Sequence, residues 1–119
     1  MSDRILQRAK EINFQLMTSS PQKLKDYFLI QIVAPVGKNV LGINNKFYSV
    51  SNDGAETIVK LVDETIVITV SDNKVEIHKK YKDGSLILLI VDFVDDKGYV
   101  GDHLLTKEKL IATLESVFE

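Results

Sequence analysis

Four aspartates in the last third of the chain form its densest group of side chains that could do chemistry. A pair of carboxylates in a cleft can act as general acid and base, and carboxylate oxygens are also calcium ligands. The four residues are Asp92, Asp95, Asp96 and Asp102. A calcium loop needs oxygen ligands at alternate positions, but the third position counted from Asp92 is Val94 and from Asp95 is Lys97. We therefore interpret the group as turn and helix-start residues, and keep all four as surface candidates for binding a partner.

The segment HKKYK at residues 78–82 is the clearest hint of nucleic-acid binding, because bases can stack on Tyr81 beside cations. On a strand, however, Lys80 and Lys82 point to one face while Lys79 and Tyr81 point to the other, which divides the charge. Lysines are also common on edge strands, where they discourage association between sheets. His78, Lys80 and Lys82 are therefore kept as surface candidates for protein binding.

The sequence contains no motif for a metal, a cofactor or a nucleophile. The chain has no cysteine, and its two histidines, His78 and His103, lack the spacing of a metal-binding pair. No serine lies in a GxSxG turn, and the segment PVGKNVLG at residues 35–42 lacks the spacing of a phosphate-binding loop. We therefore expect neither metal nor cofactor, and no enzymatic activity.

Composition is typical of a globular domain, with 45% hydrophobic and 27% charged residues among 119, and we expect a single α+β domain over residues 1–119. The net charge of −2 does not favour nucleic acid as a partner. The longest apolar run, Leu86–Val91, is too short to span a membrane. Residues 1–10 lack the apolar core of a signal peptide, so a cytoplasmic location is expected.

Hydrophobic spacing predicts helices at both ends of the chain. Ile5, Ala9, Ile12 and Leu16 recur at helical spacing within residues 3–17, with Leu6 and Phe14 widening the stripe. Ser20 followed by Pro21 is typical of a helix start, and predicts a second helix over residues 21–28. A last helix is expected over residues 105–118, capped by Thr106 or Asp102.

The middle of the chain changes to a period of two residues, which predicts strands. The expected strands are residues 29–34, 40–43, 47–50, 57–62, 65–70, 75–81 and 85–93, with turns at residues 44–46, 52–54, 72–73 and 82–84. The last of these strands is apolar on both faces, so it should be central and covered on both sides. The expected fold is an antiparallel β-meander of six or seven strands, as a curved sheet or a partly closed barrel, with two N-terminal helices and one C-terminal helix.

Three functions fit these features. The first is a non-catalytic protein-interaction module, such as an adaptor, an inhibitor, an immunity or anti-defence factor, or a chaperone-like partner. The second is a small protein that binds an apolar ligand in a cavity between the sheet and the C-terminal helix. The third, an enzyme that uses a carboxylate pair from the four aspartates, is disfavoured because such clusters near turns are usually structural. A homodimer is compatible with each of them, because an open meander leaves strand edges to cover.

Overall fold

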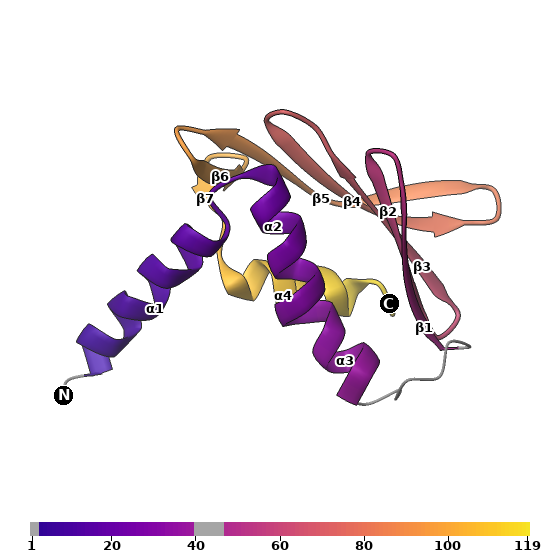
Figure 1. The fold of residues 1–119 in the computed structure, drawn as a ribbon, viewed down its shortest axis with the longest axis horizontal. Helices are drawn as coiled ribbons and strands as arrows, with labels where there is room; N and C mark the ends of the chain where they lie inside the picture. The colour runs from indigo at the N-terminus through magenta and orange to yellow at the C-terminus, as the bar shows by residue number, and fades with distance from the viewer. Residues whose placement is uncertain (1–2, 40–46) are drawn as a thin grey trace.

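The computed structural model describes residues 3–39 and 47–119, and it confirms the predicted α+β fold: an antiparallel β-meander with helices at both ends. Each strand pairs with its neighbours in the chain, in the order β1 to β7, and the sheet is open rather than closed into a barrel (Figure 1). The strands are β1 (Tyr48–Asp53), β2 (Glu56–Leu61), β3 (Glu64–Val70), β4 (Lys74–Tyr81), β5 (Gly84–Val94), β6 (Lys97–Val100) and β7 (His103–Leu104).

The helices flank this sheet in sequence, and most of them cover one of its faces. They are α1 (Asp3–Met17), α2 (Pro21–Tyr27), the π-helix η1 (Phe28–Val33), α3 (Ala34–Asn39) and α4 (Lys107–Ser116). Figure 1 shows α2, α3 and α4 on one side of the sheet, while α1 extends away from them. As predicted, Ser20 caps α2 by accepting a hydrogen bond from the Lys23 amide, and Thr106 caps α4 in the same way with Lys109.

The core lies between the sheet and α2, η1 and α4. Strand register aligns the inward side chains in rows, such as Thr57, Ile68 and Ile77, which are neighbours on successive strands. Leu24 and Phe28 from the N-terminal helices and Leu110 from α4 are fully buried against this face. Other fully buried core residues are Val33, Val59, Leu61, Ile66, Val75, Val91 and Val117.

The prediction of a strand at residues 29–34 was wrong, because this segment continues the helix of α2. Leu24, Phe28 and Ile32 are buried at successive intervals of four residues, so the helical period runs through the apolar run. The wide π turns immediately precede Pro35, which has no N–H for the Gln31 carbonyl and would crowd it in a regular α-helix. The predicted strand at residues 40–43 and the turn at 44–46 lie outside the described residues.

The prediction that residues 85–93 form a strand covered on both faces was also wrong. The strand exists as β5, but β6 pairs only with its last residues, Asp92 to Val94. The first half of β5 therefore pairs with β4 alone. Leu86 and Ile87, which point to opposite faces of this half, are each about half exposed, so neither face is covered there. The β4–β5 hairpin end projects beyond the rest of the sheet in Figure 1.

Candidate functional site

The four candidate aspartates lie at successive turns and strand positions around β5 to β7. Asp92 is on β5, where its Oδ1 is 3.8 Å from Nζ of Lys74 on β4. Asp95 and Asp96 form the two-residue turn between β5 and β6, with φ of 51° and 62°. Asp102 occupies the next tight turn, after Gly101 with φ of 61°. Each aspartate thus has a local role in the meander, and aspartate is among the few residues that tolerate positive φ.

This interpretation of the aspartate turn can be tested with a substitution that improves the turn. The double variant Asp95→Asn, Asp96→Gly installs the Asn-Gly pair favoured where both turn residues have positive φ. We expect the free energy of unfolding to rise by about 1 kcal/mol, measured by urea denaturation. Gly101→Ala is the matched control and should lower it by a similar amount, because it adds a side chain at positive φ. A loss of stability in the double variant would contradict the turn role.

The basic candidates lie on the sheet away from the aspartate turns. His78 is half-buried on the face that carries no described helix, with its Nε2 3.8 Å from Oε2 of Glu76 on the same strand. Lys80 is exposed on β4 and Lys82 is exposed in the β4–β5 turn. His103 is exposed on β7. Among the residues that the structure describes, no group of three histidine, aspartate or glutamate side chains could hold a metal ion.

A buried lysine on the helix-covered face was not anticipated as a paired group. The side chain of Lys79 is 7% exposed, and its Nζ lies 3.3 Å from Oε2 of Glu64 on β3 and 5.3 Å from the centre of the Tyr81 ring. Strand alternation correctly places Lys79 with Tyr81, but the pairing with Glu64 depends on the β3–β4 register. Lys79 is the cross-strand neighbour of the buried Ile66, so the ion pair lies at the edge of the core and has a structural role.

Several of the most exposed apolar side chains among the described residues lie on α1. Ile5, Ile12 and Leu16 expose 62%, 43% and 67% of their surface, and Leu6 and Met17 expose 48% and 40%. With the exposed Ala9, the residues Ile5, Ile12 and Leu16 form what we call the outer stripe, repeating at spacings of four, three and four. The sequence predicts this stripe but places Phe14 within it, whereas Phe14 is on the opposite side and is the one buried residue of α1.

The inner face of α1 is polar, which is the reverse of an ordinary amphipathic surface helix. Phe14 anchors it by an edge-to-face contact with Tyr27 of α2, with ring centres 5.2 Å apart. On either side of this contact lie Gln7 and Glu11, joined by a hydrogen bond of 3.5 Å, and Arg8, whose Nη1 is 3.4 Å from the Glu11 carboxylate. Arg8 and Glu11 therefore lie on the side of α1 that carries Phe14, where their side chains stay 66% and 49% exposed, and the apolar stripe faces solvent.

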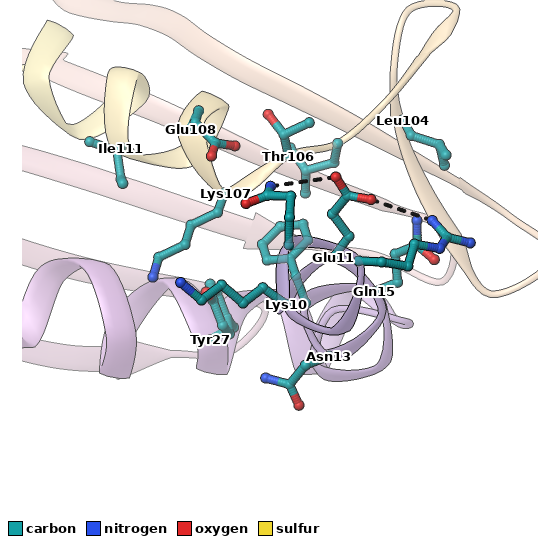
Figure 2. Close-up of a pocket in the computed structure, with 14 residues that line it drawn as sticks. Lys10, Glu11, Asn13, Gln15, Tyr27, Leu104, Thr106, Lys107, Glu108 and Ile111 are labelled. Atoms are coloured by element: carbon teal, nitrogen blue, oxygen red, sulfur yellow. Dashed lines mark hydrogen bonds and ion pairs between the residues drawn. The ribbon is translucent and has the colours of Figure 1, made fainter. Parts of the chain in front are cut away.

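A crevice of about 750 Å³ separates this inner face from the start of α4. Figure 2 shows Lys10 from α1 and Lys107 from α4 reaching into it, with Glu108 and Thr106 on the α4 wall and Tyr27 at its base. The lining combines charged side chains of both signs with apolar ones such as Phe14, Leu105 and Ile111. The crevice lies between α1 and the start of α4, with Leu104 of β7 in its lining. It is not a cavity between the sheet and α4 of the kind an apolar ligand would need, since Val91, Leu110 and Val117 are fully buried there.

Tyr27 at the base of the crevice should make stability sensitive to alkaline pH. Burial, and then the negative charge of Glu108, raises the pKa of Tyr27 above its ordinary value of about 10. Above pH of about 10 the unfolded chain loses the Tyr27 proton while the folded protein keeps it. The contribution of Tyr27 to the free energy of unfolding is therefore complete below that pH and is lost as pH rises through the folded pKa. Tyr27→Phe should reduce the decline in a urea titration above that pH, and the exposed control Tyr81→Phe should not. Equal declines in both variants would contradict this role.

A second, smaller hollow borders the outer stripe. This groove of about 280 Å³ is lined by Leu16, Met17, Lys23, Asp26, Tyr27, Ile30 and Gln31. Ile30 of η1 is 63% exposed, so the groove continues the apolar surface of α1 onto the body of the protein. The outer stripe and the groove together form one apolar surface.

Comparisons of the chain with protein-family models, with curated proteins and with solved structures find no match. Among residues 3–39 and 47–119, no helix combines the length and the apolar character needed to cross a membrane.

Proposed function

We propose that this chain is a non-catalytic intracellular protein-interaction module, and that it binds its partner through the outer stripe of α1. One observation carries the proposal: the apolar face of an amphipathic helix, with Leu16 67% exposed, is turned away from the core while the polar face is turned inward. Large apolar patches on a folded protein mark interaction sites.

Energetics support this assignment. A 15-residue helix is marginal on its own in water, and α1 is held to the rest of the protein through a single buried side chain, Phe14. Full burial of an isoleucine or leucine contributes about 1.5–3 kcal/mol, so covering the half-exposed stripe would recover several kcal/mol. That gain is large enough to offset much of the entropy lost on association, and it is available only if another chain covers the stripe.

The spacing of the stripe also indicates the shape of the partner. Apolar residues at alternating intervals of four and three follow the 3.5-residue repeat by which two helices pack together. The stripe spans about three such repeats, and its flanks carry Arg8, Asn13 and Gln15, which remain at the rim. A partner helix is therefore expected. Adaptors, inhibitors and immunity proteins all belong to the class of proteins that act in this way.

Photo-cross-linking tests the proposal directly. A photoreactive amino acid placed at Ile12 in the full chain, expressed in cells of its own source, should give a discrete adduct to protein. The same group at Ser51, exposed on β1, is the control and should give none. Adding Leu16→Glu should abolish the Ile12 adduct. If Ile12 gives no adduct, or if the adduct is unaffected by Leu16→Glu, the proposal is wrong.

A further inference from the structure

We propose that the partner helix is α1 of a second copy of this chain, packed antiparallel across a two-fold axis. This inference rests on the function proposed above and adds the identity of the partner. It differs from a dimer formed through the open edges of the sheet, because here the contact is made by the outer stripe and the groove beside it.

The spacing within the stripe is the same when read in either direction. The intervals from Ile5 to Leu16 are four, three and four, so an antiparallel copy presents apolar residues at matching heights. Ile5 of one copy then lies opposite Leu16 of the other, and Ala9 lies opposite Ile12. The two central contacts of the pair thus each set the small Ala9 against the large Ile12, and a small side chain facing a large one packs without a gap. A parallel pair would instead set Ala9 against Ala9 and leave a gap.

The groove allows a second contact between the two copies, made by Leu6 of the partner, and only the antiparallel arrangement brings Leu6 to it. Leu6, Asn13 and Met17 follow one another at spacings of seven and four, so they share one flank of α1, and Met17 at the end of this flank lines the groove. The same flanks adjoin in an antiparallel pair, which brings Leu6 of one copy beside Met17 and Ile30 of the other. Leu6 is 48% exposed in the single chain, and the groove gives it an apolar place to bind.

The apolar area available on each copy sets the expected strength of the dimer. At about 25 cal/mol per Å², the full burial of a leucine or isoleucine corresponds to about 60–120 Å² of apolar surface. The exposed parts of the stripe, Leu6, Met17 and Ile30 therefore offer roughly 200–400 Å². Stable interfaces bury about 800 Å² per partner, of which somewhat more than half is apolar. A two-fold pair covers the outer stripe and the groove of each copy, and the apolar area per copy is smaller than that of a standard interface. The expected dimer is weak, with a Kd on the order of micromolar.

Sedimentation equilibrium on the full chain measures the association. The mass should rise from 13.4 kDa toward twice that value as concentration increases from about 1 to 500 µM. Ile12→Glu puts a charge into both central contacts and should weaken the dimer at least about 100-fold. Gln7→Glu adds the same charge on the opposite side of α1 and should dimerise as the unsubstituted chain does. Circular dichroism confirms that both variants are folded. A monomer throughout, or equal effects of the two variants, would overturn the proposal.

Disulfide trapping determines the direction of pairing, and the chain has no cysteine of its own to interfere. A mixture of the single variants Ala9→Cys and Ile12→Cys should oxidise mainly to the mixed disulfide, because these positions face each other in the antiparallel pair. Dominant Ala9→Cys self-pairing would overturn it. If the chain is monomeric but the Ile12 photo-cross-link captures a different protein, the second-copy proposal fails and the interaction function stands; if no adduct forms, the function itself fails.

Discussion

Replacing Phe28 by alanine should lower the free energy of unfolding by about 3–5 kcal/mol, the largest effect we expect from a single substitution. Phe28 is 1% exposed and lies where α2 passes into η1, among the side chains that fill the space between the helices and the sheet. Its removal leaves a cavity within the packed core, which the surrounding helices and strands can fill only in part. Urea denaturation with a two-state fit measures the loss.

Ile30→Ala is the matched control for Phe28→Ala. Both residues belong to η1 and are two positions apart, but Ile30 is 63% exposed. Its substitution should change monomer stability by no more than about 0.5 kcal/mol. If Phe28→Ala were as mild as Ile30→Ala, the placement of η1 on the sheet would be wrong, and with it the position of the groove.

The second large effect is expected at the ion pair between Lys79 and Glu64. Glu64→Gln removes the negative charge and leaves the ammonium of Lys79, only 7% exposed, without a counter-ion 3.3 Å away. Removing one partner of a fully buried pair costs about 3–5 kcal/mol, and because Glu64 is 30% exposed we expect about 2 kcal/mol. Lys79→Met removes the charge that needs a partner and should be nearly neutral.

Asp92→Asn is the control for this pair. Asp92 and Lys74 also face each other across two strands, at 3.8 Å, but their side chains are 56% and 43% exposed. Exposed pairs contribute about 0–1 kcal/mol, so this substitution should have little effect in the same urea titration. Equal losses for Glu64→Gln and Asp92→Asn would show that burial does not distinguish the two pairs.

Local signals in the sequence predict much of this fold. Ser20 with Pro21 and Thr106 correctly mark the starts of α2 and α4, and alternation correctly locates β2 to β5. The errors fall where local signals are ambiguous. The run at residues 29–33 is apolar except for Gln31, and it is too short for its period to separate strand from helix. The short strands β6 and β7 were not predicted, because they form by pairing with earlier strands rather than from their own pattern.

The candidate site was only partly predictable. The stripe through Ile5, Ile12 and Leu16 is evident from its spacing, but spacing shows only that a helix has an apolar face, not which molecule covers it. Phe14 lies outside the 3.5-residue repeat of the stripe, and that offset was the one available sign that α1 packs inward through a different side. The groove could not be predicted, since it combines α1 and α2 with Ile30 of η1, a segment expected to be a strand.

Hydrogen exchange of the α1 amides at two protein concentrations tests the central claim most directly, namely that the outer stripe belongs to an interface and not to the fold of a single chain. At low concentration α1 should exchange quickly, because Phe14 alone anchors it. At high concentration its amides should become protected while those of β3 and β4 stay unchanged. Protection of α1 that is the same at both concentrations would contradict the pairing of two copies through the outer stripe.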